Sequence, residues 1–122
     1  MLIAGPPGSG KSSLALALLD RGAQLIGDDG VTLECEGACI VARPPPNIAG
    51  LLEVRNVGLM EMPTTTAPLA IAIVLNMQAE RLPTRHGKMH VLGRDVPQVE
   101  LYPDTPWLAL RAKAALERCG AV

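Results

Sequence analysis

The residues best suited to chemistry in this chain form one short segment, Gly5 to Ser12, which reads G-P-P-G-S-G-K-S. It fits the phosphate-binding pattern G-x-x-x-x-G-K-[ST] and stands between an apolar run and a helical pattern, the context which that motif requires. Glycines let backbone N–H groups surround the oxygens of a polyphosphate, and the start of the next helix favours an anion. We predict that the chain binds a nucleoside triphosphate, with a chance glycine-rich turn as the alternative.

Two residues of this segment carry specific roles. We expect the Lys11 ammonium to reach the β- and γ-phosphates and the Ser12 hydroxyl to hold a Mg²⁺ ion. The full set of predicted nucleotide-binding residues is Gly5, Pro6, Pro7, Gly8, Ser9, Gly10, Lys11, Ser12 and Ser13.

Two adjacent carboxylates, Asp28 and Asp29, follow Lys11 by 17 and 18 residues. One helix and one strand would return them to the loop. One carboxylate could then hold the water shell of Mg²⁺ while the other accepts a proton from an attacking hydroxyl. On spacing alone, a solvated Asp-Asp-Gly turn that opens a hairpin is an equally good interpretation.

The elements that must position these groups follow from apolar periodicity and turn residues. Leu2–Ala4 reads as a short strand, Lys11–Arg21 as a helix ended by Gly22, and Gln24–Gly27 as a strand that leads to the acidic pair. Further strand candidates are Val31–Glu36, Cys39–Ala42, Met89–Leu92 and Val96–Leu101.

The second half of the chain contains the clearest strand and the clearest helix. The continuous apolar run Leu69–Leu75 is typical of a central strand buried on both faces. The last helix is predicted from Thr105 as N-cap, Pro106 in the first turn and Gly120 after the end. Its packing face is expected to contain two rows of residues, namely Trp107, Leu110, Ala114 and Leu108, Ala112, Ala115.

Composition narrows the class of protein. The 122 residues suit one domain, and the net charge of −1 gives no electrostatic footprint for nucleic acid or an anionic membrane. No apolar run approaches the ~20 residues of a membrane span. Three cysteines, Cys35, Cys39 and Cys119, show no paired-ligand spacing and are interpreted as reduced thiols of a cytoplasmic protein, with a redox or zinc site as the alternative.

The beginning of the chain is unusual. Only Met1 to Ala4 precede the loop, whereas a typical strand has ~5–6 residues. We expect that residues which once preceded this strand are missing, with an unusually short strand as the alternative.

Three motifs in order resemble the C-terminal catalytic domain of HPr kinase/phosphorylase. They are the loop itself, A-L-L-D-R-G-A-Q-L-I-G-D-D at Ala17–Asp29, and L-L-E-V-R-N-V-G-L-M at Leu51–Met60. The family pattern for the last two is R-G-x-x-L-x-A-D-D and a signature close to L-L-E-I-R-G-L-G-I-I. The resemblance covers Met1 to about Met62 and then weakens. It implies an α/β fold of the P-loop, phosphoenolpyruvate-carboxykinase-like type with a mixed sheet, from which N-terminal strands are missing here.

The resemblance also implies an activity and a partner. The expected protein is an ATP- and Mg²⁺-dependent kinase that phosphorylates a serine of the phosphocarrier protein HPr and so regulates carbohydrate metabolism through the phosphotransferase system. In the family, the same site also removes this phosphate by phosphorolysis. The family commonly forms hexamers, so the resemblance implies a possible homo-oligomer.

Site residues are carried over by matching motifs. Asp29 or its neighbour Asp28 is the implied proton acceptor in the forward reaction and proton donor in reverse. Without the resemblance, Glu53 and Arg55 would read as a solvated strand face or a simple ion pair. With it, the implied catalytic residues are Lys11, Asp28, Asp29, Arg55 and Arg81, and the implied metal-binding residues are Ser12 and Glu53.

The chain also departs from the family pattern. Ser13 stands where the family usually has an acidic residue, and Tyr102–Thr105 contains no arginine, whereas long family members carry basic residues there for dephosphorylation. The family's histidine lies upstream of the phosphate loop. These departures keep a second hypothesis open, a catalytically impaired nucleotide-binding sensor module of the same fold.

Overall fold

The computed structural model describes residues 1–46, 50–104 and 106–121. These residues group into two compact units, one formed by Met1–Lys11 with Leu69–Val122 and the other by Ser12–Pro68. Among the residues described, no helix has the length and apolar character needed to cross a membrane.

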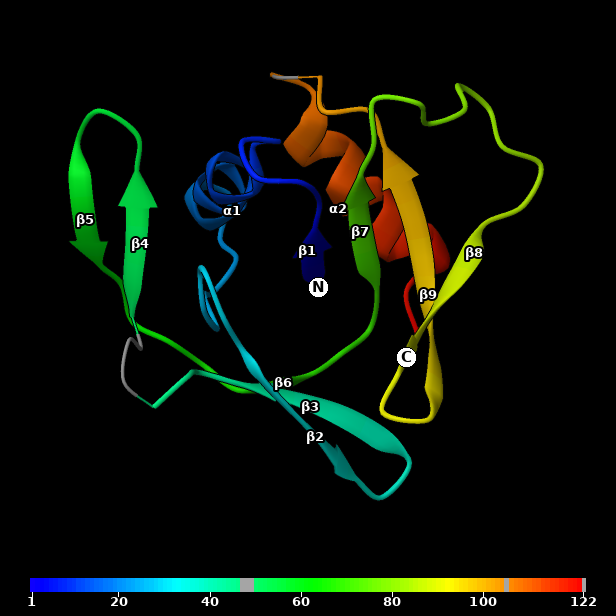
Figure 1. Ribbon diagram of the computed structural model, residues 1–122, viewed down its shortest axis with the longest axis horizontal. Helices are drawn as coiled ribbons and strands as arrows, with labels where there is room; N and C mark the ends of the chain where they lie inside the picture. Colours follow the sequence, from blue (N-terminus) through cyan, green and yellow to red (C-terminus); the bar gives the residue numbers. More distant parts are fainter. Residues whose placement is uncertain (47–49, 105, 122) are drawn as a thin grey trace. The chain divides into compact units, whose positions relative to one another are not determined.

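The first unit contains a four-stranded mixed sheet. Its strand order is β1 (Leu2–Ala4), β7 (Ala72–Leu75), β9 (Arg94–Leu101) and β8 (Gly87–Val91). The first three strands are parallel, and β8 runs antiparallel to β9 (Figure 1). The predicted central strand is confirmed for Ala72–Leu75, because β7 lies between β1 and β9 and Ile73 is fully buried. The first three residues of the predicted range, 69–71, precede the strand. Branched apolar side chains on both faces explain this burial.

Helix α2 (Leu108–Cys119) belongs to the same unit and packs on β9. Only one of the two predicted rows is buried, that of Leu108, Ala112 and Ala115. The expectation for Trp107, Leu110 and Ala114 is wrong, since all three are exposed. A helix of this kind buries one stripe against a sheet, and the second row falls outside that stripe.

The ends of α2 were predicted with mixed success. The helix begins at Leu108 with Trp107 as its N-cap residue, and no side chain caps it. The predicted N-cap, Thr105, lies outside the described residues. The predicted stop is confirmed, because Gly120 is the C-cap and its N–H donates to the Leu116 carbonyl at 3.0 Å.

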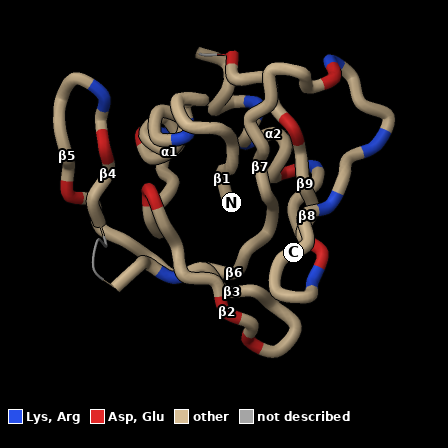
Figure 2. The backbone as a smooth tube through the Cα atoms, in the orientation of Figure 1, with Lys and Arg blue, Asp and Glu red and all other residues tan. Residues whose placement is uncertain are grey.

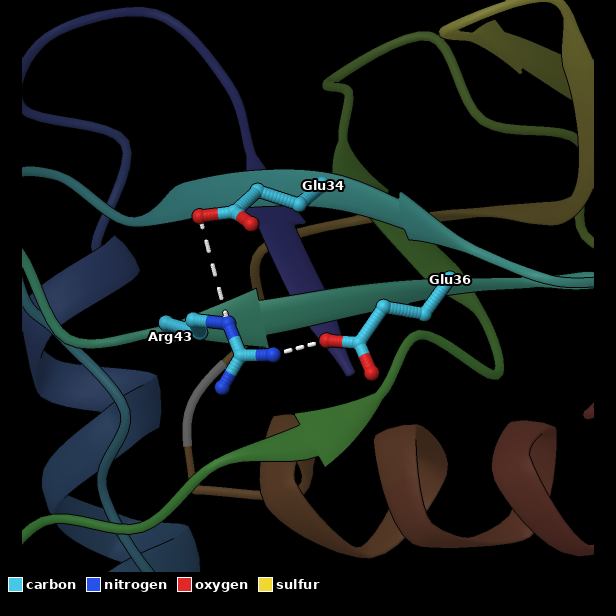
Figure 3. Close-up of polar contacts among 3 residues, drawn as sticks. All are labelled: Glu34, Glu36 and Arg43. Carbon is cyan, nitrogen blue, oxygen red and sulfur yellow. Dashed lines mark hydrogen bonds and ion pairs between the residues drawn. The ribbon is translucent and has the colours of Figure 1, made fainter.

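In the second unit, a hairpin forms where the alternating pattern predicts one. β2 (Thr32–Glu36) and β3 (Cys39–Arg43) pair antiparallel, and β6 (Ala67–Pro68) adds to β3. On the exposed face of the hairpin, Arg43 forms ion pairs with Glu36 and, at 3.9 Å, with Glu34 (Figure 3). None of the three cysteines forms a disulfide.

A second hairpin carries the signature segment. β4 (Leu51–Val54) pairs antiparallel with β5 (Gly58–Glu61). The turn between them is tight, with φ of 68° at Asn56 and 134° at Gly58. Leu52 anchors the hairpin with a fully buried side chain, while every residue of β5 is exposed.

The predicted strand Gln24–Gly27 is wrong. A single parallel bridge joins Leu25 to Thr64, and the Thr65 N–H donates to the Leu25 carbonyl at 2.9 Å. The partner segment is bounded by Pro63 and Pro68, which have no N–H to donate, so the ladder cannot extend. Leu25 is nevertheless buried, and this one bridge holds the approach to the acidic pair.

Candidate nucleotide-binding site

The phosphate loop connects β1 to α1 (Lys11–Asp20), as its pattern predicts. Gly8 and Gly10 have φ of 78° and 101°, conformations that side chains other than glycine rarely adopt. A Cβ at either position would meet no atom within 4 Å. The backbone at these two glycines is therefore open to an approaching anion.

The base of the loop, in contrast, is closely packed. A Cβ on Gly5 would lie 2.7 Å from Ser9 Oγ and 3.2 Å from Leu75 Cβ, at the end of β7. The Ser9 N–H donates to the Pro6 carbonyl at 3.1 Å. Within the described residues, the buried Ser9 hydroxyl has no hydrogen-bond partner. The loop is therefore closely packed at Gly5, where it leaves the sheet, and open at Gly8 and Gly10.

Lys11 turns back over this loop. Its Nζ donates to the Gly5 carbonyl at 2.7 Å and to the Pro6 carbonyl at 3.4 Å. The side chain is half-buried. The ammonium therefore lies within the loop itself, where it can exchange these carbonyls for phosphate oxygens.

Asp28 links the second motif to the first and the third. Its Oδ1 accepts a hydrogen bond from Ser12 Oγ at 2.7 Å, and its Oδ2 accepts one from the backbone N–H of Glu53 at 3.0 Å. The prediction that an acidic residue returns to the phosphate loop is therefore met by Asp28. The bond to Glu53 was not predicted, and the only signal for it is that the resemblance joins the three motifs in one site.

The atoms at this junction fit Mg²⁺. A serine hydroxyl and a carboxylate are hard oxygen ligands, and Mg²⁺ in nucleotide enzymes is commonly held by one or two such groups together with phosphates and water. In the part of the chain that the structure describes, no three His, Cys, Asp or Glu residues gather as a metal site. If Ser12 and Asp28 hold a Mg²⁺ ion, the nucleotide and water would supply the other ligands of its coordination shell.

The remaining predicted site residues are exposed and make no described contact with one another. Asp29 is more exposed than Asp28, and Ser13 is exposed on the first turn of α1. The Glu53 side chain is exposed although its backbone is bound to Asp28. Two exposed arginines lie further along the chain, Arg55 in the β4–β5 turn and Arg81 in the β7–β8 connection.

Comparison with known proteins gives consistent results. A family model described as "HPr Serine kinase C-terminal domain" matches residues 1–104. The HPr kinase/phosphorylase of Cupriavidus pinatubonensis is 33% identical over 114 residues, which cover 83% of this chain and 35% of that protein. That of Bacillus pumilus is 33% identical over 115 residues, covering 83% of this chain and 37% of that protein.

A solved structure shares the fold. The HPr(Ser) kinase/phosphatase from Coxiella burnetii matches 94% of this chain and 79% of that chain, with a TM-score of 0.80 and 26% identity. This confirms the predicted α/β fold with a mixed sheet. The chain spans about a third of the length of the curated relatives named above. By its sequence and by its fold, the chain belongs to the HPr serine kinase C-terminal domain family.

Proposed function

We propose that this chain is the catalytic part of an ATP- and Mg²⁺-dependent serine kinase that acts on an HPr-type phosphocarrier protein. The observation that carries the proposal is the Ser12–Asp28 hydrogen bond of 2.7 Å, which joins the phosphate loop to the acidic pair. Family membership supports the substrate, since the relatives are named HPr kinase/phosphorylase. The cysteines, none in a disulfide, support a cytoplasmic location.

The residues divide into those that hold phosphates and those that hold the metal. The open backbone at Gly8 and Gly10 and the Lys11 ammonium would bind the phosphate oxygens. Ser12 and Asp28 would hold Mg²⁺, with the exposed Glu53 carboxylate as a further metal-side group. When bound, the metal neutralises charge on the phosphates as it develops.

The structure also supports a division of labour within the acidic pair. Both oxygens of Asp28 already accept hydrogen bonds, whereas Asp29 is exposed and makes none in the described residues. We therefore assign Asp28 to the metal side and Asp29 to the serine hydroxyl. In the forward step the serine oxygen bonds to the γ-phosphorus, the bond to the β–γ bridging oxygen breaks, and Asp29 accepts the hydroxyl proton.

Two arginines complete the proposed set. Arg55 and Arg81 are exposed cations whose side chains have no described partner, so either is available to the transferred phosphoryl group. Transfer in the kinase direction is the activity we propose; the absence of arginine from Tyr102–Thr105 argues against efficient phosphorolysis.

The test is phosphoryl transfer from γ-labelled ATP to HPr in the presence of Mg²⁺. We expect label on HPr with the wild-type chain, none with Lys11→Ala, and none when the acceptor serine of HPr is replaced by alanine. No transfer by the wild-type chain, with nucleotide binding intact, would contradict the proposal.

The sensor hypothesis is favoured by one feature, Ser13 at a position where the family usually has an acidic residue. It predicts nucleotide binding without turnover. Under that hypothesis Asp29→Asn leaves every measured property unchanged, whereas under the kinase proposal it lowers transfer by about 100-fold or more.

A further inference from the structure

Four exposed apolar residues belong to segments that lie at the carboxyl ends of β7 and β9 in the first unit. Met77 follows β7, Tyr102 follows β9, Trp107 is the N-cap residue of α2 and Leu110 lies in its first turn, with exposed fractions of 63%, 44%, 59% and 49%. Tyr102 and Trp107 are the only two aromatic residues of the chain. Aromatic side chains carry large apolar surfaces, and apolar residues that are exposed together are typical of an interaction site. We call these four residues the aromatic edge.

The aromatic edge is held in place by the fold. The Asn76 N–H donates to the Leu101 carbonyl at 2.9 Å, which joins the starts of the two segments that carry Met77 and Tyr102. Arg111 Nη2 donates to the Tyr102 carbonyl at 2.8 Å and to the Asp104 carbonyl at 3.3 Å. The segment after β9 is thereby fastened to α2.

The positions of Trp107 and Leu110 are set by the packing of the opposite face of α2. They are three residues apart, so they share one face of α2. The opposite face is buried through Leu108, Ala112 and Ala115. Trp107 and Leu110 are therefore exposed because α2 packs on the sheet through its opposite face.

The same edge of the sheet carries the phosphate loop. β1, β7 and β9 are parallel, so the segments that follow them leave the sheet at one edge (Figure 1). The contacts run in sequence across it: Gly5 packs on Leu75, and Leu75 pairs with Leu101, the residue before Tyr102. With ~4.8 Å between strands, β1 and β9 are about 10 Å apart.

Asp104, between Tyr102 and Trp107, pairs with Arg111 at 4.0 Å, so the positive excess next to the aromatic edge comes from the β7–β8 connection. The β7–β8 connection and the start of β8 contain Arg81, Arg85 and Lys88 against Glu80, which gives +2 in a chain of net charge −1 (Figure 2). Tryptophan, tyrosine and arginine are the residues most enriched in the energetic centres of protein interfaces. A nucleobase site, in contrast, is concave, whereas these side chains are widely exposed.

We propose that the aromatic edge is the docking surface for the protein that accepts the phosphoryl group. That partner would bind through an apolar patch of its own surface that is bordered by acidic side chains. The proposal rests on the proposed kinase function. Two of the four residues, Trp107 and Leu110, lie beyond the residues that the family model matches, so the surface is argued from this chain alone.

The single tryptophan supplies a direct test. Trp107 emission is recorded while the wild-type chain is titrated first with Mg-ADP and then with a phosphocarrier protein that has no tryptophan. We expect little change with Mg-ADP and a saturable blue shift with the phosphocarrier protein, because docking removes the indole from water. An equal response to Mg-ADP alone would mean nucleobase stacking and overturn the proposal, as would no response to either.

Kinetics supply the second test. Trp107→Ala and Tyr102→Ala should each raise KM for the phosphocarrier protein by about tenfold, with kcat and Mg-nucleotide affinity retained. Trp107→Phe should keep KM for the phosphocarrier protein close to the wild-type value, because an aromatic ring is retained. The matched control is Leu92→Ala, because Leu92 is 55% exposed but lies in the β8–β9 turn, at the opposite end of β9.

The outcomes separate the two proposals. If the wild-type chain transfers phosphate and KM is unchanged in both aromatic variants, docking at this surface is disproved and the kinase proposal stands. If the wild-type chain binds nucleotide but transfers nothing to the phosphocarrier protein, the kinase proposal is disproved. The docking proposal, which rests on it, is then disproved as well unless the Trp107 titration shows saturable binding.

Discussion

Asp28 is the residue that connects the parts of the candidate site. One of its oxygens binds the serine of the phosphate loop and the other binds the backbone of the signature hairpin. Its neighbour Asp29 has neither contact and is exposed. Two carboxylates of identical chemistry are thus given different environments, as the proposed division into a metal-side acid and a proton acceptor requires.

The first prediction separates the two acids. Asp29→Asn should leave the Mg²⁺-dependent affinity for nucleotide unchanged and lower transfer by about 100-fold or more, because an amide cannot accept the serine proton. Asp28→Asn should weaken the Mg²⁺-dependent part of nucleotide binding. Titration calorimetry with and without Mg²⁺, beside the transfer assay, measures both. The reverse pattern would exchange the two roles.

The second prediction concerns Ser9. Its hydroxyl is buried and has no hydrogen-bond partner in the described residues. An unsatisfied buried hydroxyl contributes nothing that alanine would lose, so Ser9→Ala should leave the free energy of unfolding unchanged or raise it by up to about 1 kcal/mol. Urea denaturation monitored by circular dichroism measures this. A loss of more than about 1 kcal/mol would show that the hydroxyl is bonded in solution.

At the scale of elements, the short turn Gly27–Gly30 decides where the acids lie. A Cβ on Gly27 would clash with the Gly30 carbonyl and come within 3.1 Å of Pro45 Cδ. The family pattern has alanine at this position, so the turn in this chain is closer than the pattern requires. The single bridge at Leu25 is the only ladder contact that leads into it within the described residues.

The third prediction follows from this turn. Gly27→Ala introduces the residue typical of the family, yet it should reduce Mg²⁺-dependent nucleotide binding here, because the backbone must shift and carry Asp28 away from Ser12. Gly30→Ala is the matched control, since a Cβ there would meet no atom within 4 Å. Equal binding by both variants would contradict the argument.

The hairpin β2–β3 gives a fourth prediction at the same scale. The Arg43 pairs are solvent-exposed, so Glu36→Gln should change the free energy of unfolding by less than about 1 kcal/mol, and less still at high salt. Ile40→Ala in the same hairpin removes a buried side chain and should cost about 2–5 kcal/mol. Parallel urea titrations of the two variants provide the comparison.

At the scale of the whole molecule, local chemistry was easier to predict than tertiary environment. The phosphate loop and the central strand within Leu69–Leu75 were predictable, although the strand begins only at Ala72, because glycine conformation and continuous apolar runs act locally. The strand at Gln24–Gly27 was not, because two prolines in a distant partner segment limit its pairing. The exposed face of α2 was not either, because a helical row of apolar residues looks alike in the sequence whether it covers a sheet or faces outward.

The same limit applies to the candidate site. The spacing of the motifs did not distinguish Asp28 from Asp29. Nothing in the sequence indicated that the Glu53 backbone N–H, 25 residues further along the chain, would donate a hydrogen bond to Asp28. The roles of Arg55, Arg81 and Glu53 remain predictions, as do the single-domain organisation and the hexamer that the resemblance implies.

The carbonyls that hold Lys11 have a consequence for which anions the loop admits. An ammonium bound at 2.7 Å by Gly5 is released only to a competitor that offers stronger acceptors. A singly charged anion such as chloride offers one acceptor in place of two peptide oxygens, whereas a polyphosphate offers several charged oxygens at once. Resting contacts of this kind would let the loop ignore the abundant small anions of a cell and respond to the tail of a nucleotide.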